Sequence, residues 1–282
     1  MNKSFYVETT ELCYRETDMS ELERGPCRFG CDIQIVCVGG YGTISTGIQS
    51  YEMRMGTELF LLGGALVKAQ DLSPDFRVCI LMYPKDVVMK AILPLSTDFL
   101  NYIHEFPYFD HLCQEAEPGE WDYVRQWMDM AKTLFSSPVP HFRKQLEQNF
   151  LQSLLMCIFN NMPQTVIRNG YQYSRRKMLC HQFVRLIREN SSEEHQVPFY
   201  ARQLGISSRY LGDLVAENFG GKTAKRLIDE QLVAEIKAQL DNPQLSVFEI
   251  AEYFNFPEHT CLSRFFKRIT GMSPKEYRQM RK

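Results

Sequence analysis

The first third of the chain carries short runs of apolar residues that are separated by glycines. The run Asp32–Val38 is followed by the turn signal Gly-Gly-Tyr-Gly at 39–42. Short runs with glycine-rich breaks are typical of the strands of a small sandwich or barrel. The runs that follow are 43–46, 48–55, 58–62, 65–69 and 77–82. The pattern therefore predicts a β region over 28–95.

From about residue 96 the apolar positions recur with the period of a helix. The residues expected on one buried face of a first helix are Trp121, Val124, Met128, Ala131 and Phe135. After two prolines, the segment Phe142–Phe159 repeats large apolar residues every fourth position. This second stripe would either lie on the β region or meet its own copy in a homodimer. We favour the homodimer slightly.

The segment 160–174 holds few large apolar residues and precedes a remainder that is helical throughout. A chain of 282 residues suits two domains at about 150 residues each. We expect a first domain over 1–165, with helices at about 96–161, then a linker at 166–174 and a second domain over 175–282.

The second domain contains a helix-turn-helix pattern that begins at Val197. Such a unit needs a small residue within its first helix, a turn residue that tolerates positive φ, and a buried aliphatic residue further on. Ala201, Gly205 and Leu211 stand at these places, and Ser207 is placed to cap the second helix. One such pattern alone would equally suit a plain helical hairpin.

A second copy of the pattern follows fifty residues later, with Ala251, Asn255 and Leu262 in the same roles. Asn tolerates the left-handed conformation best after Gly. Between the copies, Lys222–Leu240 reads as one helix about 28 Å long, close to the ~34 Å between successive turns of a DNA groove. Two units joined by such a rod would read adjacent major-groove segments.

Four further segments carry a more specific signal. They are Gly220–Thr223, Leu245–Ala251, Leu262–Gly271 and Met272–Arg278, the last two containing Phe-Phe-Lys-Arg and Ser-Pro-Lys-Glu-Tyr-Arg. Together they resemble the signature of AraC/XylS-family transcriptional regulators over about 175–282. The resemblance implies an all-helical DNA-binding domain with units at about 197–218 and 246–269. It also implies a cupin-like N-terminal domain, although residues 1–165 match the family only in the order of strands and helices and contain no specific motif. The expected fold class is α+β: a small β-barrel or sandwich with trailing helices, then the all-α domain.

The resemblance also implies which residues face DNA. Those in the first unit are Ser207, Ser208, Arg209, Gly212 and Asp213. Those in the second unit are His259, Thr260, Cys261, Ser263, Arg264, Lys267 and Arg268. Arg264 is the strongest candidate for base reading, because an arginine can bind guanine O6 and N7 together. Lys267 and Arg268 would clamp phosphates, with ordinary solvated side chains as the alternative.

Several residues depart from the family pattern. Gly212 offers no side chain, and Asp213 carries a charge that phosphates repel but that a cytosine N4 amine would satisfy. Base reading by the first unit is therefore weakly supported, and we expect this unit mainly to contact the DNA backbone. Gln231 stands where many members carry Arg, and Asn255 replaces the usual Gly. His195 lies in no motif and is interpreted as a surface residue.

Charge supports a nucleic-acid partner for the second domain. Residues 171–282 hold 18 Lys and Arg against 13 Asp and Glu, whereas 1–170 hold 14 against 21. The N-terminus lacks an apolar secretion signal and no apolar run approaches the ~20 residues of a membrane span, so we expect a cytoplasmic protein without a membrane partner. The nine scattered cysteines are interpreted as reduced thiols.

Enzyme functions find little support. None of the six histidines falls in 28–95, which disfavours a metal-dependent cupin enzyme. The glycines at 39–42 lack the context of a phosphate-binding loop. We expect no catalytic residue, metal or cofactor.

The resulting hypothesis is a one-component regulator that binds double-stranded DNA under the control of a small molecule held by the β domain. Arg28, Lys68 and Arg77 are the cations of that region that would meet an anionic effector. An RNA polymerase contact and an activator role are implied by the family resemblance alone. The alternative is a dimeric DNA-binding or protein-interaction regulator whose β domain binds no ligand.

Overall fold

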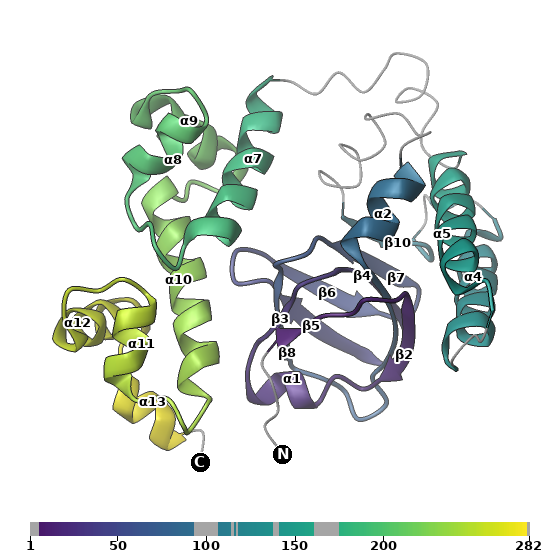
Figure 1. The fold of residues 1–282 in the computed structure, drawn as a ribbon, viewed down its shortest axis with the longest axis horizontal. Helices are drawn as coiled ribbons and strands as arrows, with labels where there is room; N and C mark the ends of the chain where they lie inside the picture. The colour runs from purple at the N-terminus through teal and green to yellow at the C-terminus, as the bar shows by residue number, and fades with distance from the viewer. Residues whose placement is uncertain are drawn as a thin grey trace.

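The computed structural model describes residues 6–92, 107–113, 116, 118–137, 141–160 and 175–280. A β sandwich with helices on one face forms the N-terminal domain, and a helical C-terminal domain lies beside it (Figure 1). The strands are β1 (Tyr6–Val7), β2 (Cys13–Thr17), β3 (Cys27–Phe29), β4 (Asp32–Gly39), β5 (Tyr41–Ser45), β6 (Ser50–Arg54), β7 (Thr57–Leu61), β8 (Leu66–Gln70), β9 (Arg77–Tyr83) and β10 (Tyr108–Asp110). The N-terminal helices are α1 (Glu21–Arg24), α2 (Lys85–Ile92), α4 (Glu120–Phe135) and α5 (Arg143–Asn160).

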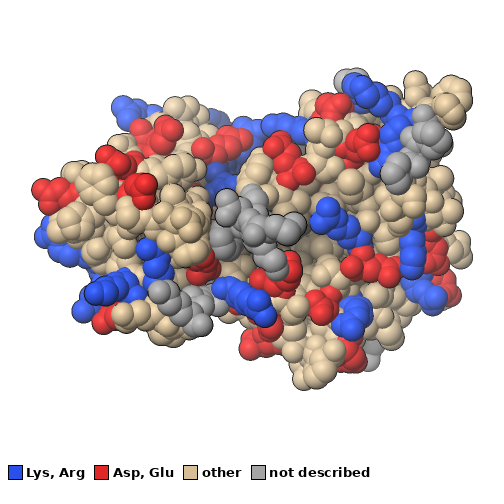
Figure 2. Space-filling view, turned by 60° about the horizontal axis from the view of Figure 1, so that its bottom comes forward, with Lys and Arg blue, Asp and Glu red and all other residues tan. Residues whose placement is uncertain are grey.

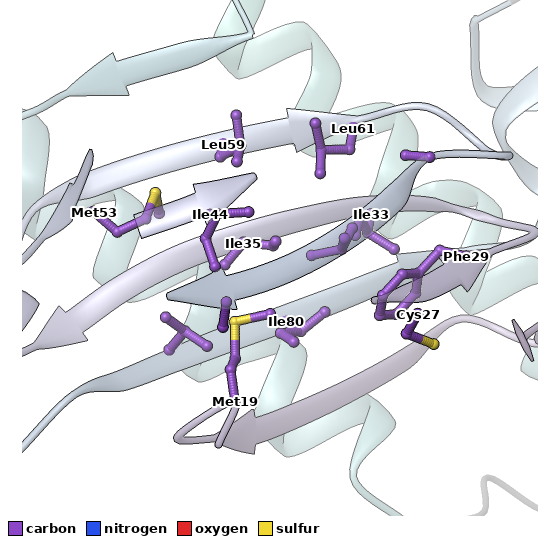
Figure 3. Close-up of a cluster of buried hydrophobic side chains, with 14 of the residues drawn as sticks. Met19, Cys27, Phe29, Ile33, Ile35, Ile44, Met53, Leu59, Leu61 and Ile80 are labelled. Carbon is purple, nitrogen blue, oxygen red and sulfur yellow. The ribbon is translucent and has the colours of Figure 1, made fainter. Parts of the chain in front are cut away.

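The strands form two separate sheets that pack face to face. One has the order β1-β3-β8-β5-β6 and the other the order β10-β7-β4-β9-β2. The expected α+β class is confirmed, and of its two alternatives for the N-terminal domain the sandwich is right and the closed barrel wrong. The space between the sheets holds hydrophobic side chains, among them Ile33, Ile35, Ile44, Leu59 and Ile80 (Figure 3).

Strand β4 explains why its sequence reads as a nearly continuous apolar run. Successive side chains of a strand point to opposite faces of its sheet. Ile33 and Ile35 enter the core between the sheets, whereas Val36 enters a second cluster beneath α2, α4 and α5. Because both faces of the sheet are covered, the strand continues as an apolar run from Ile35 to Val38, and the polar Gln34 before it is buried with hydrogen bonds to Glu58 and Tyr83.

The apolar stripe of α5 packs within its own chain. Phe150, Leu151 and Leu154 are buried in the cluster beneath the helices, together with Val124 and Phe135 of α4. Arg143 and Glu147 of α5 also bind the backbone of Leu12, whose N–H donates to the Glu147 carboxylate over 3.1 Å. The sequence left two partners open for this stripe, the β region and a second copy of the chain. Packing within the N-terminal domain accounts for the buried residues of the stripe.

A buried histidine joins this helical layer to the second sheet. The Nε2 atom of His111 lies 2.7 Å from Glu58 Oε2 on β7, and its Nδ1 atom lies 2.6 Å from Glu120 Oε1 at the start of α4. Burial lowers the pKa of His111, but the hydrogen bonds to the two carboxylates outweigh it and raise that pKa. The His111 ring thus links α4 to the second sheet through its two carboxylate partners.

Two expectations about the N-terminal domain are wrong. The β region does not continue to residue 95, because α2 begins after Pro84 and buries Val87 and Ala91 on one face. Strands also lie outside 28–95: β2 pairs with β9, and β10 pairs with β7 inside the stretch expected to be helical. These short strands are specified by distant partners rather than by their own periodicity. The expected linker 166–174 lies outside the described residues.

The C-terminal domain is all helical. Its helices are α7 (Arg175–Asn190), α8 (Val197–Gln203), α9 (Ser208–Asn218), α10 (Ala224–Leu240), α11 (Val247–Tyr253), α12 (His259–Thr270) and α13 (Pro274–Met280). α8 with α9, and α11 with α12, form the two helix-turn-helix units on one side of α10 (Figure 1). Leu227 and Ile228 of α10 enter the core of the first unit, while Leu232 and Ile236 enter that of the second. One helix therefore supports two separate cores. In the described part of the chain, no helix is long and apolar enough to cross a membrane.

Candidate nucleic-acid interface

The first unit is built as its spacing predicts. Ala201 is buried where α8 crosses α9, and Leu211 anchors α9 in the same core. Gly205 adopts φ +65°, and the N–H of Ile206 donates to the carbonyl of Ala201 over 3.0 Å, closing the turn. Ser207 caps α9, because its hydroxyl accepts the backbone N–H of Tyr210 over 3.1 Å.

The second unit repeats this geometry with different residues. Asn255 adopts φ +52° at the turn, and the N–H of Phe256 donates to the carbonyl of Ala251 over 2.9 Å. Ser246 and Glu249 form a reciprocal capping box at the start of α11. α12 is the second helix of the expected unit 246–269, and Glu258 precedes it without a side-chain cap. We call the second helices of the two units, α9 and α12, the recognition helices.

Most of the residues expected to face DNA are exposed on α9 and α12. The exposed ones are Ser207, Ser208, Arg209, Asp213, His259, Thr260, Arg264, Lys267 and Arg268, and the half-buried ones are Gly212, Cys261 and Ser263. The Nη2 atom of Arg264 lies 3.5 Å from Cys261 Sγ, and the residue is exposed. Arg209 and Asp213 are both exposed on the outer side of α9, where solvent or a partner can reach them.

The two recognition helices differ in charge. α9 carries Arg209 against Asp213 and Glu217, whereas α12 carries Arg264, Lys267 and Arg268 and no carboxylate. Figure 2 shows Lys and Arg gathered along the lower left edge of the C-terminal lobe, with acidic side chains above them. A polyanion is therefore attracted more strongly to α12 than to α9.

Arg268 has a partner that the sequence did not indicate. Its guanidinium lies 3.6 Å from Asp229 Oδ2 and 5.6 Å from the centroid of the Phe265 ring. Asp229 is buried on α10 and also accepts a hydrogen bond from Lys225 over 2.7 Å. A buried carboxylate within a helical run has no sequence signature of its own, which is why this ion pair was missed.

His195 is not the surface residue that we expected. Its ring lies 5.0 Å from that of Phe256, and its Nε2 atom is buried without a hydrogen-bond partner among the described residues. Burial first, and then the neighbouring Lys225 ammonium, lower the pKa of His195. The partial burial of the His195 ring could have been suspected from its position two residues before the first unit, in the turn between two helices.

The first unit and α10 also contact the β domain. Arg28 of β3 places Nη2 2.6 Å from Glu235 Oε1 on α10, and the same oxygen accepts hydrogen bonds from Ser191 and Gln231. Ile48, from the loop between β5 and β6, is buried in the first unit's core. Of the three cations expected to meet an anionic effector, Arg28 is thus paired with the long helix.

Two helix-turn-helix units on one connecting helix define the C-terminal domain as belonging to the class of bipartite DNA-binding domains. Residues 200–280 match the family model described as "Helix-turn-helix domain". The predicted AraC-type character of this domain is confirmed: the C-terminal domain is an AraC-type helix-turn-helix domain.

One relative in sequence matches about half of the chain, and two solved structures match nearly its whole length. The chain is 26% identical over 141 residues to YpdC, an uncharacterized HTH-type transcriptional regulator of Escherichia coli strain K12. This match covers 48% of the chain and 47% of YpdC, about half the length of each. Two structures of ToxT from Vibrio cholerae share the arrangement of both domains. The apo form of a single-residue ToxT variant has a TM-score of 0.50 at 13% identity, covering 98% of this chain and 99% of ToxT. A second crystal form has 0.51 at 10% identity, covering 96% and 99%.

Proposed function

We propose that this chain is a sequence-specific DNA-binding transcriptional regulator whose α9 and α12 enter successive segments of the major groove. The observation that carries the proposal is the pair of helix-turn-helix units on α10. At 17 residues α10 is about 25 Å long, comparable with the ~34 Å of one DNA turn. The exposed outer residues of both recognition helices would therefore face the same side of a duplex.

The two helices would contribute differently to binding. Arg264 is exposed, and Cys261 is its hydrogen-bond partner among the described residues, so its guanidinium would reach a guanine edge. Lys267 lies one helical turn away and would contact phosphate. Arg268 would join the phosphate contacts while Asp229 neutralises part of its charge. Ser207, Ser208 and Arg209, at the start of α9, would contact the DNA backbone, and Gly212 has no side chain with which to contact a base.

The test is selection of binding sites from random duplex DNA at one fixed salt concentration, because affinity for DNA depends strongly on salt. Wild type, R264A and R125A would be compared, since Arg125 is an exposed arginine of α4 far from both units. We expect wild type and R125A to enrich the same site. R264A should lose preference at one or two base pairs at a cost of ~1–3 kcal/mol. Absence of any enriched site with wild type would contradict the proposal.

We further propose that the β domain controls DNA binding through its contact with α10, and that a small molecule bound by this domain would act there. A ligand changes DNA affinity only through unequal affinity for two arrangements of the protein. In one such arrangement, the ion pair of Arg28 with Glu235 holds α10, and with it both helix-turn-helix units, against the β domain. Hydrophobic side chains fill the space between the sheets, which by itself favours a β domain without a ligand. The proposal therefore places control at the contact with α10 and not at a site between the sheets.

The competing function is an effector-independent regulator whose N-terminal domain only dimerises. R28Q separates the two without knowledge of the ligand, because it removes the contact to α10 directly. Control through the contact predicts that R28Q changes affinity for the selected site at least fivefold in either direction. Unchanged affinity, together with a dimer in sedimentation, would favour the competing function. A homodimer through α5 and a contact with RNA polymerase stay predictions.

A further inference from the structure

The two helix-turn-helix units are joined at a second place besides α10. The turn between α7 and α8, residues 191–196, reaches across to the turn of the second unit. There the ring of His195 lies 5.0 Å from that of Phe256, which in turn lies 5.5 Å from that of Phe265 on α12. An unbroken row of rings thus leads from the start of the first unit to the second recognition helix.

Polar contacts run beside this row. The side-chain amide of Asn255 donates to the carbonyl of Glu193 over 3.3 Å. Lys225 donates to the carbonyl of His195 over 2.9 Å and to Asp229 over 2.7 Å. Asp229 pairs in turn with Arg268 of α12 over 3.6 Å. We call these contacts of His195, Asn255, Phe256, Lys225 and Asp229 the inter-unit clasp.

The clasp constrains a motion that α10 alone would permit. The cores of the two units are separate, so bending of α10 between Ile228 and Leu232 would move one recognition helix relative to the other without opening either core. The clasp closes a second connection beside that stretch of α10, because Lys225 and Asp229 lie at its start. It therefore resists both bending and rotation about the helix axis.

We propose that His195 and Asn255 are positioning residues that fix the separation of α9 and α12, and so restrict the protein to one spacing between the two halves of its DNA site. The inference rests on the proposed function. Each added base pair moves one half by about 3.4 Å and turns it by about 35° around the duplex. A rigid pair of helices cannot follow such a change, whereas two units that move independently about α10 follow it in part.

Asn255 serves two purposes that a substitution can separate. Its backbone needs a residue that tolerates φ +52°, and its side chain makes the bond to Glu193. Gly satisfies the first need and abolishes the second, so N255G keeps the turn and removes the contact. At His195, Ala removes the ring that packs on Phe256. H141A is the matched control, because His141 is exposed on the other domain.

The experiment measures affinity for duplexes in which the two halves of the selected site are separated by the natural spacer, or by one or two base pairs more or fewer. Wild type and H141A should lose at least tenfold on a change of one base pair. H195A/N255G should lose threefold or less on the same change, while binding the natural spacing only a few-fold more weakly. The single variant N255G leaves the His195 ring packed on Phe256, so its affinity should depend on spacer length to an intermediate degree. It replaces the double variant if the double variant fails to fold.

Two results would overturn the inference. In one, the variants bind every spacing more weakly by the same factor, which indicates a structural role without influence on spacing. In the other, wild type itself tolerates all spacings equally. Both differ from failure of the proposed function, in which wild type selects no sequence at all.

Discussion

The two helix-turn-helix units share a plan and differ in what surrounds it. The first has Gly205 at its turn, a recognition helix of mixed charge, and Ile48 of the β domain in its core. The second has Asn255 at its turn, a basic recognition helix, and a core of its own residues. The difference shows that two units of the same fold can have different roles in one domain. The first unit connects the DNA-binding domain to the β domain, and in the proposed function the second supplies most of the attraction and selectivity for DNA.

The largest effect should come from the contact of the β domain with α10. R28Q leaves the buried carboxylate of Glu235 without its cation, although Ser191 and Gln231 still donate to it. Breaking a buried ion pair on one side costs about 3 kcal/mol at the lower end of the usual range. We expect the urea midpoint of unfolding to fall accordingly, with R125Q unchanged. An unchanged midpoint for R28Q would mean that the first unit is not held by the β domain.

The next effect separates the two recognition helices. R264A should weaken binding to the selected site by about 2 kcal/mol, roughly thirtyfold, because a bidentate contact to a base is lost. R209A should cost less than about 1 kcal/mol, as expected for one exposed ionic contact. Fluorescence anisotropy with a labelled duplex measures both. Equal losses would show that the two units read DNA alike and would remove the proposed division.

A smaller effect concerns pH and the inter-unit clasp. Because burial and Lys225 lower the pKa of His195 in the folded protein, the unfolded chain binds its proton first as the pH falls. Stability from the neutral ring is therefore complete above pH ~6.5, the pKa of an unperturbed histidine, and is lost as the pH falls through the lowered value.

His111 changes the free energy of unfolding with pH in the opposite direction. Its raised pKa contributes stability below pH ~6.5, and this stability is lost as the pH rises. The measurement is therefore the difference between wild type and H195N in unfolding free energy from pH 8 to pH 5.5. This difference should shrink as the pH falls. A difference that is constant over this range would contradict a neutral His195 ring with a buried Nε2 atom.

The smallest effect belongs to Gly212 of the first unit. A Cβ added there meets no atom within 4 Å, and Gly within a helix is less stable than Ala by about 1 kcal/mol. G212A should therefore raise the free energy of unfolding by about 0.5–1 kcal/mol. If the first unit contacts only the DNA backbone at a distance, affinity stays within twofold. A marked loss of affinity would show instead that α9 approaches the duplex closely at this residue.

The sequence predicts the parts of the fold that depend on neighbours along the chain. Ala201, Gly205 and Leu211 could be assigned because a tight turn between two helices imposes requirements at fixed spacing. Asn255 could be assigned for the same reason. β4 and β9 could be assigned because burial on both faces of their sheet leaves nearly continuous apolar runs. The strands between them were marked by the glycine-rich breaks that separate short runs.

What the sequence does not reveal depends on distant partners. β2 alternates weakly and is a strand only because β9 pairs with it. The stripe of α5 has the same pattern whether a sheet or a second chain covers it. Asp229 and His195 look like solvated polar residues until α12 and the turn at 255–256 are placed against them. Their roles follow from the tertiary arrangement alone.

The most direct test of the account is base-removal interference on the selected duplex, in which each nucleoside is missing in turn and the bound and free fractions are compared. Two recognition helices held on one side of α10 predict two groups of interfering bases, centred about 10 base pairs apart on one face of the DNA. The group contacted by α12 should interfere more strongly. A single group, or two groups on opposite faces, would contradict the claim that both units occupy successive major-groove segments.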